Sequence, residues 1–208
     1  MVTAVAETNH MQALALFAEV LEYPEPDIAK TVSRCEALVA EQPEAAALLA
    51  DFRAFTRLVP LGRLQEIYTS AFDLDTLSDL DATLYPYVGH HLFGESYKRS
   101  AFMTELNSRM RTFDYVVERE LPDHLVVLLR FLAVCPDEEL AGEIVHDAMI
   151  PALVRMAGDD DADETQPLEA VSGREVYRRL LKALRLVLEL FPHNVVESEP
   201  VGSGAPVQ

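Results

Sequence analysis

The chain has 208 residues, 50% of them hydrophobic and 25% charged, proportions that exclude a wholly disordered chain, a collagen and a disulfide-stapled mini-protein. Its 35 acidic residues outnumber the 17 basic ones and give a formal net charge of -18. This balance disfavours nucleic acids and anionic membrane surfaces as partners and favours a cationic one, such as an arginine-bearing peptide. The alternative is that the charge only keeps the protein soluble.

The first third of the chain has the spacing of amphipathic helices. Apolar residues recur every three or four positions over residues 14–21, and this helix should end at Tyr23-Pro24, because the residue before a proline avoids the α region. Prolines followed by acidic residues predict two further helices, over residues 26–40 and 43–55. An apolar stripe over residues 64–72 predicts a fourth.

Loops and helices alternate through the middle of the chain. Residues 73–81 are expected to form an acidic loop, and the aromatic segment 84–93 predicts a short or broken helix. Ser96 should cap a long helix that continues through Met110.

The last third contains three further predicted helices. Pro122 and Asp123 should occupy the first turn of an apolar helix that ends near Val134. The next helix begins at Pro136, and Pro151 should kink or interrupt it. After an acidic linker, a capping box predicts a last helix that runs to Phe191.

These elements predict an all-α, single-domain helical bundle of about eight or nine helices, because no window shows strand alternation. The domain should span residues 1–191, with the linker near 158–167, and residues 192–208 should be a disordered tail. Cys35 and Cys135 are expected to be free, buried thiols in a reducing compartment. The sequence has neither a membrane span nor secretory features, so a cytoplasmic location is expected.

The histidines offer one route to catalysis. His90 or His91 together with the pair His146-Asp147 could supply ligands to a metal-dependent, all-α phosphohydrolase. A dipeptide carries little information, however, and His146 could equally be an ordinary helix residue. Neither a nucleophile elbow nor a phosphate-binding glycine loop is found, which favours a binding protein over an enzyme.

Two polar segments combine turn chemistry with charge. Gly94 can adopt positive φ and turn the chain, while Arg99 can reach neighbouring carboxylates. Glu120 and His124 flank a predicted helix start, where His124 could change its charge near neutral pH. Each segment could instead be purely architectural, the first a helix corner and the second a helix cap.

Three segments carry a resemblance to a known family, and they are Tyr-Thr-Ser-Ala-Phe-Asp (68–73), His-Leu-Phe-Gly-Glu-Ser-Tyr-Lys-Arg (91–99) and Glu-Leu-Pro-Asp-His-Leu (120–125). The stretch Leu-Glu-Tyr-Pro-Glu-Pro-Asp (21–27) agrees with them. The chain resembles the TorD/DmsD/NarJ assembly chaperones of molybdenum enzymes of the dimethyl sulfoxide reductase superfamily, above all the nitrate reductase delta-subunit (NarJ-type) branch.

The resemblance implies a TorD-like fold and a cytoplasmic chaperone without catalytic residues, bound metal or stably bound cofactor. Such a chaperone binds the N-terminal leader of the catalytic subunit, often a twin-arginine signal, and supports insertion of the molybdopterin cofactor before assembly or export. The client could be a nitrate, selenate, chlorate, dimethyl sulfide or ethylbenzene enzyme. The chaperone could be a monomer or a homodimer, or alternatively a subunit retained in the mature enzyme.

The same resemblance implies where the client peptide binds. Asp123 is expected to face the client groove and to offer its charge to an arginine of the leader. The expected binding residues come from the three segments, and they are Tyr68, Phe72, His91, Phe93, Gly94, Glu95, Arg99, Pro122, Asp123 and His124.

Overall fold

The structure, a computed structural model, describes residues 2–72, 84–158 and 173–192. Within these ranges the regular secondary structure is helical, apart from an isolated antiparallel bridge between Tyr87 and His124. The all-α prediction is therefore confirmed. The predicted acidic loop, nearly all of the predicted linker and tail, and the serine of the last predicted capping box lie outside the described residues.

The described helices are, in chain order, α1 (Val2–Val20), α2 (Ile28–Leu38), α3 (Pro43–Leu58), α4 (Leu61–Phe72), α5 (Val88–Phe93), α6 (Tyr97–Thr112), α7 (Leu125–Leu132), α8 (Glu138–Glu143), the π-helix η1 (Ile144–Met149), α9 (Ile150–Ala157) and α10 (Gly173–Leu188). If α8, η1 and α9 are taken as one interrupted helix, the described residues form nine helices, in agreement with the prediction.

The breaks between the first helices lie close to where the sequence predicts them, although α1 begins at Val2, well before the predicted stripe at 14–21, and α3 continues to Leu58. α1 ends at Val20, shortly before Tyr23-Pro24, and α2 begins directly after Asp27. Pro43 is the first residue of α3, where a missing backbone N–H leaves no hydrogen bond unmade.

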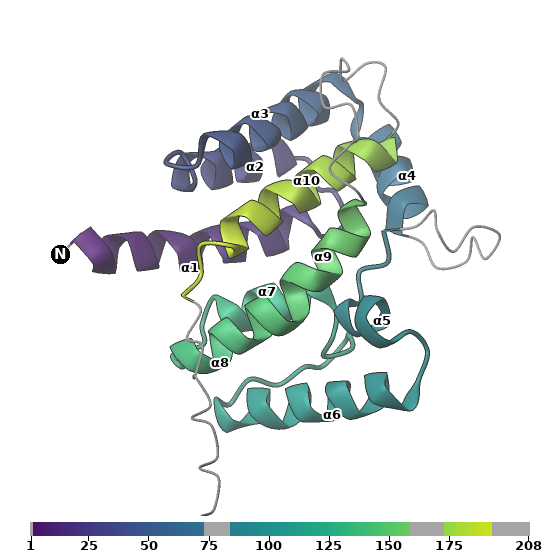
Figure 1. The fold of residues 1–208 in the computed structure, drawn as a ribbon. Helices are drawn as coiled ribbons and strands as arrows, with labels where there is room; N and C mark the ends of the chain where they lie inside the picture. The colour runs from purple at the N-terminus through teal and green to yellow at the C-terminus, as the bar shows by residue number, and fades with distance from the viewer. Residues whose placement is uncertain (1, 73–83, 159–172, 193–208) are drawn as a thin grey trace, which may run out of the picture.

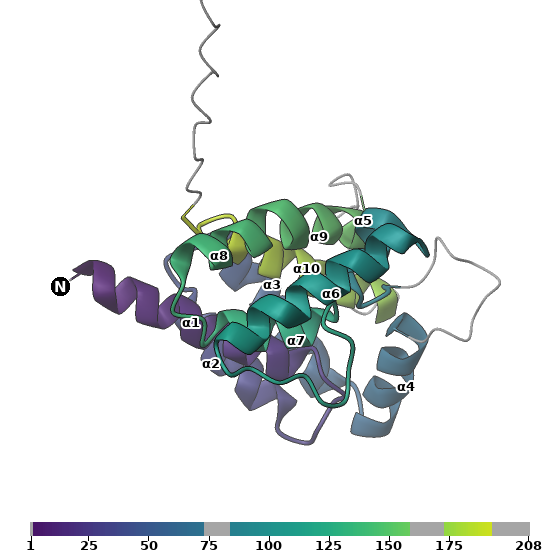
Figure 2. The same ribbon diagram turned by 90° about the horizontal axis from the view of Figure 1, so that it is seen from below.

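α10 crosses the middle of the molecule and joins its two halves. It packs against α3 on one side and α9 on the other, and also contacts α4 (Figure 1). α1 packs against α2 and α7, while α5 links α9 to α6. α6 itself lies at the periphery, below α8 and α9 in Figure 1 and in front of α7 in Figure 2.

Among the residues that the structure describes, Tyr177 of α10 is the largest fully buried side chain, and it packs at the centre of an aromatic cluster in the core. Its ring meets Phe52 of α3 at 5.4 Å between centroids and Phe72 of α4 at 5.1 Å, both edge to face. Such pairs add about 0.5–1.5 kcal/mol to the burial of the rings themselves. Phe72, predicted to bind a client peptide, is thus a buried core residue that fixes α4 against α10.

Pro151 interrupts the regular α-helix, as predicted, but α8, η1 and α9 follow one another without a loop between them. Immediately before α9 the helix widens to the π-helix η1. Pro151 lies in the first turn of α9. A proline has no N–H to donate and crowds the carbonyl four residues earlier, and a π turn relieves both constraints.

Two predicted helix starts differ in detail from the structure. Pro122 and Asp123 precede α7 rather than forming its first turn, and His124 is the N-cap, its Nδ1 accepting a hydrogen bond from the Val126 N–H at 3.2 Å. Ser96 is the N-cap residue of α6, yet its hydroxyl donates to the Phe93 carbonyl at 2.9 Å instead of capping the helix.

Both cysteines are free and buried, as predicted. Burial raises the pKa of the Cys35 thiol to about 12, so this side chain is a core residue rather than a nucleophile. Among the helices that the structure describes, none has both the length and the hydrophobicity that a bilayer-spanning segment requires.

Candidate functional site

Two of the segments singled out in the sequence meet at the start of α5. The Val88 N–H donates to the Asp123 carbonyl at 2.8 Å, and the Leu125 N–H donates to the Pro86 carbonyl at 2.7 Å. These bonds flank the bridge between Tyr87 and His124. The backbone therefore holds the start of α5 and the residues before α7 side by side, although they are more than thirty positions apart.

A buried ion pair ties α6 to this junction. Arg99 Nε donates to Asp123 Oδ2 at 2.8 Å, and Arg99 Nη1 donates to Glu95 Oε1 at 2.6 Å. Burial opposes the charged form of Arg99, but the bonds to the two carboxylates outweigh it and raise its pKa. The predicted contact of Arg99 with neighbouring carboxylates is confirmed.

Asp123 does not face a client groove, contrary to the sequence-based expectation. Its side chain is 0% exposed, and its Oδ2 accepts a hydrogen bond from Arg99, which is also buried. A buried carboxylate needs a charged or hydrogen-bonding partner, and Arg99 supplies both. Asp123 therefore supports the site from inside and cannot contact a bound peptide directly.

Next to this pair lies a surface that we call the tyrosine–glutamate surface, formed by Glu22, Tyr68, Tyr87, Glu120 and His124. The Tyr87 hydroxyl donates to Glu120 Oε2 at 3.3 Å, and the Tyr87 ring meets the His124 ring edge to face at 5.2 Å. Burial and the negative charges of Glu22 and Glu120 raise the pKa of Tyr68 to about 12. Residues from four separate segments thus share one electrostatic environment.

Glu120 is the exposed carboxylate of this surface. No cation within the described ranges forms an ion pair with it, whereas Glu22 pairs with Arg130 at 2.7 Å. Beside it, Tyr87 already holds the guanidinium carbon of Arg99 at 5.3 Å from its ring centroid. Carboxylates flanked by aromatic rings are suited to bind guanidinium groups.

The place of His124 in the helix cap favours its neutral form. Its Nδ1 accepts a hydrogen bond from a backbone N–H, so the ring proton is on Nε2. Burial lowers the pKa of His124, against the opposite effect of Glu120 and Asp123. Its change of charge therefore comes at a lower pH than the near-neutral value expected from the sequence.

His91 and His146 form hydrogen bonds with backbone carbonyls. His91 Nε2 donates to the Tyr85 carbonyl at 2.7 Å, and burial lowers the pKa of its ring. His146 Nε2 donates to the Phe191 carbonyl at 3.0 Å. Of the histidines in the hypothetical metal site, His91 and His146 are thus bonded to different carbonyls, and His90 is bonded to Glu95. The described residues contain no group of three side chains that could hold a metal ion.

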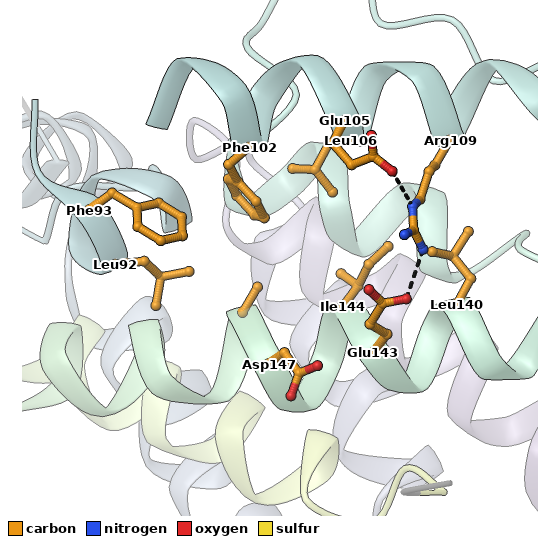
Figure 3. Close-up of a pocket in the computed structure, with 11 residues that line it drawn as sticks. Leu92, Phe93, Phe102, Glu105, Leu106, Arg109, Leu140, Glu143, Ile144 and Asp147 are labelled. Atoms are coloured by element: carbon orange, nitrogen blue, oxygen red, sulfur yellow. Dashed lines mark hydrogen bonds and ion pairs between the residues drawn. The ribbon is translucent and has the colours of Figure 1, made fainter. Parts of the chain in front are cut away.

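A hollow lies beside α5, between α6 and the α8–η1 segment (Figure 3). It has a volume of about 230 Å³ and a mainly apolar lining that includes Phe93, Phe102, Leu106, Leu140, Ile144 and Ala148. Phe93, at one end, packs against Phe102 at 5.5 Å between centroids. Of the predicted binding residues, Phe93 is therefore the one found in this apolar groove.

Charged residues surround the apolar groove, and three of them, Glu105, Arg109 and Glu143, were not singled out in the sequence. Arg109 Nε lies 2.7 Å from Glu105 Oε1 of the same helix, and Arg109 Nη1 lies 2.7 Å from Glu143 Oε2 across the groove (Figure 3). Asp147 also lines it. These residues occupy ordinary helical positions, so no local pattern in the sequence could have indicated that they meet.

The remaining predicted residues have structural or peripheral positions. Gly94 has φ 61°, which confirms the predicted turn, and the space beside it is open. Glu95 is exposed, and hydrogen bonding from His90 together with the charge of Arg99 lowers its pKa. Pro122 is half-buried next to Asp123.

The comparisons with known proteins agree with this architecture. Residues 36–158 match the nitrate reductase delta subunit family, which is more than half of the chain, and the chain therefore belongs to this family. A crystal structure of a redox enzyme maturation protein from Archaeoglobus fulgidus is similar, with 25% sequence identity and a TM-score of 0.55. The similarity covers 86% of this chain and 93% of that one. No curated protein matches the sequence.

Membership of the nitrate reductase delta subunit family identifies the class of protein to which this chain belongs. The chain is a redox enzyme maturation chaperone of the nitrate reductase delta type, and this family is not catalytic. The metal-dependent hydrolase considered from the sequence is accordingly set aside.

Proposed function

We propose that this chaperone binds the N-terminal leader of the catalytic subunit of a molybdenum oxidoreductase in the cytoplasm and holds that subunit until the molybdopterin cofactor is inserted. The chaperone's own residues recognise the leader, and the cofactor is bound by the client.

The observation that carries the proposal is the exposed Glu120 of the tyrosine–glutamate surface, which accepts a hydrogen bond from Tyr87 and forms no ion pair with any described residue. A leader arginine can donate to the Glu120 carboxylate while its planar guanidinium lies against the ring of Tyr87. A net charge of -18 attracts such a segment at long range. Charge and geometry therefore favour the same class of ligand.

The chain itself contains an example of this recognition. Arg130 of α7 pairs with Glu22 at the edge of the surface, at 2.7 Å. The guanidinium of Arg99 lies over the ring of Tyr87, with its carbon 5.3 Å from the ring centroid. Two guanidinium groups of the protein thus already use the kinds of contact that we assign to the leader.

The buried pair of Arg99 and Asp123 gives the surface its shape. The Asp123 carbonyl accepts from Val88, directly after Tyr87, and His124 directly follows Asp123. Rigid support of a binding residue lowers the entropy that it loses when a ligand binds. Asp123 is therefore a positioning residue in this proposal.

Affinity capture from the native host, with mass spectrometry and molybdenum analysis of the captured complex, tests the proposed function. We expect the catalytic subunit of a molybdenum oxidoreductase that lacks its cofactor. Capture of the mature, molybdenum-loaded enzyme would show a retained subunit instead, and the absence of any molybdenum enzyme would contradict the proposal.

A further inference from the structure

The connection between α6 and α7 contains an extended segment, residues 115–118, that runs without a turn or bend. It follows a left-handed turn at Asp114, whose φ is 57°, and the connection leads the chain back along α6 towards α5 (Figure 1). Tyr115, Val116 and Val117 are residues of types that favour β-strands. A strand-forming sequence in an extended conformation therefore lies among elements that are otherwise helical within the described ranges.

The side chains of the extended segment alternate between the protein and solvent. Those of Tyr115 and Val117 pack against the core, and the Tyr115 ring meets that of Phe131 at 5.4 Å between centroids. Val116 is 64% exposed, and Glu118 is exposed as well. A period of two is that of a β-strand with one covered face, so Val116 and Glu118 share the outer face.

The backbone of the extended segment has an open edge. The Tyr115 N–H donates to the Met110 carbonyl at the end of α6, at 3.1 Å. In an extended chain the N–H groups of successive residues point to opposite sides, so those of Val116 and Glu118 point away from Met110. No backbone group of the described residues pairs with the N–H or C=O of Val116 or Glu118. Such an edge is a template for a further strand.

The same connection already pairs in the manner of a β-strand at its other end. His124 forms the isolated antiparallel bridge with Tyr87, and the bonds from Val88 to Asp123 and from Leu125 to Pro86 flank it. These partners come from the chain itself, whereas residues 115–118 have no strand beside them among the described residues. The open edge therefore continues towards the tyrosine–glutamate surface, of which Glu120 is part.

The charge along the connection selects its partner. Asp114, Glu118 and Glu120 are exposed carboxylates, and Arg119 is the one exposed cation between residues 114 and 120. A second copy of this chain carries a net charge of -18, and residues 193–208 contain two glutamates and no lysine or arginine. The acidic excess repels both, so the fitting partner is a cationic segment of another protein.

We infer that an extended, cationic segment of the client's leader joins residues 115–118 as a β-strand. It bonds to the backbone of Val116 and Glu118, with arginine side chains beside Glu118 and Glu120. The inference rests on the proposed function only for the source of that segment. Backbone bonds give affinity whatever the side chains are, so this mode accepts leaders of different sequence, while the carboxylates select cationic ones.

The test uses a probe that does not require the client to be known, a fluorescein-labelled peptide of about ten alternating arginines and threonines. A peptide of this length and composition does not form a stable helix in water. Fluorescence anisotropy at low salt measures its Kd for the full chain. The same peptide with glutamates in place of the arginines should not bind.

Two modified peptides determine whether the backbone pairs. One has N-methyl groups on all its arginines and the other on all its threonines. The arginine N–H groups lie on one edge of an extended peptide and the threonine N–H groups on the other. One modified peptide should therefore bind at least about tenfold more weakly, and the other should stay within about threefold of the unmodified Kd.

Two substitutions at Val116 give the matching test on the protein. Val116→Pro removes the N–H at the open edge and should raise the Kd at least about fivefold. Val116→Thr keeps the N–H and the β-branched shape, and should leave the Kd within about twofold. Thermal melts of both variants check that they are folded, and the modified peptides test the inference with the wild type alone.

Three results would overturn the inference. They are absence of binding by the unmodified peptide, equal effects of the two modified peptides, and equal Kd values for folded Val116→Pro and Val116→Thr. A leader that binds through Glu120 without these effects would leave the proposed function intact. Conversely, the expected effects without capture of a molybdenum enzyme would show a site for extended cationic peptides of another source.

Discussion

Gly89 packs so closely against Asp123 that no side chain fits between them. A Cβ atom at position 89 would lie 2.6 Å from Asp123 Oδ2 and 3.0 Å from the ring of Phe102. The glycine thus makes room for the buried carboxylate that holds Arg99. The site is therefore supported by three residues of different helices and loops that meet inside the protein.

This contact predicts an unusual response to Gly89→Ala. Alanine normally stabilises a helix by up to about 1 kcal/mol relative to glycine, but here the added methyl group should lower the free energy of unfolding by about 1–3 kcal/mol. Gly62 is the matched control, because it is also the second residue of its helix and has nothing within 4 Å. Urea unfolding should show Gly62→Ala to be neutral or stabilising; a similar gain for Gly89→Ala would contradict the close packing.

Asp123→Ala should act mainly on stability. It leaves the Arg99 guanidinium buried without its main partner, and breaking a buried pair in this way costs about 3–5 kcal/mol. Asp137→Ala is the comparison, since Asp137 caps α8 through the Leu140 N–H, and losing a cap costs about 1 kcal/mol. If denaturant melts gave equal losses for the two variants, the buried pair would not have the role assigned to it.

His124 should make the stability of the fold depend on pH. Its pKa in the folded protein lies below the ordinary value of 6.5, so below that pH the unfolded chain binds a proton that the folded one does not. Stability is then fully present above about pH 6.5 and falls as the pH decreases towards the folded-state pKa.

The variant His124→Asn separates this contribution from other acid effects, because asparagine can cap α7 without titrating. Thermal melts between about pH 7.5 and pH 5 should show a smaller loss of stability for the variant than for the wild type. Parallel losses would mean that the cap does not respond to protonation of His124.

The described part of the C-terminus predicts where the domain can be shortened. Phe191 is buried and its carbonyl accepts from His146, while the Pro192 carbonyl packs near Gly142. A chain ending at Pro192 should keep its melting temperature within about 2 °C. A chain ending at Leu190 loses a buried phenylalanine, worth about 3 kcal/mol, and should melt at least about 6 °C lower. Equal melting temperatures would show that Phe191 contributes nothing to the core.

Much of the fold follows from local sequence features. Proline positions and apolar spacing define α1 to α4, because these features act over one or two helical turns. The turn at Gly94 and the carboxylate partners of Arg99 also follow from the chemistry of single residues. The three segments that resemble the family, 68–73, 91–99 and 120–125, can be detected because each contains several residues of distinctive chemistry in a fixed order.

The parts that could not be predicted depend on contacts between distant segments. Asp123 has the sequence context of a helix start, and only its contact with Arg99, 24 positions away, makes it a core residue. Glu143 and Arg109 have the pattern of a solvated helix face, although they meet across the apolar groove. Periodicity indicates which face of a helix is apolar but does not indicate which helix lies opposite.

Leader binding at the tyrosine–glutamate surface is the central claim, and calorimetric titration tests it most directly. The ligand is a synthetic peptide of the captured client's leader, and the proteins are wild type, Glu120→Gln and the remote control Glu41→Gln. Loss of a charge-assisted hydrogen bond worth about 1.5–3 kcal/mol predicts that Glu120→Gln raises the Kd at least about tenfold, while Glu41→Gln leaves it nearly unchanged. An unchanged Kd for Glu120→Gln would contradict the claim.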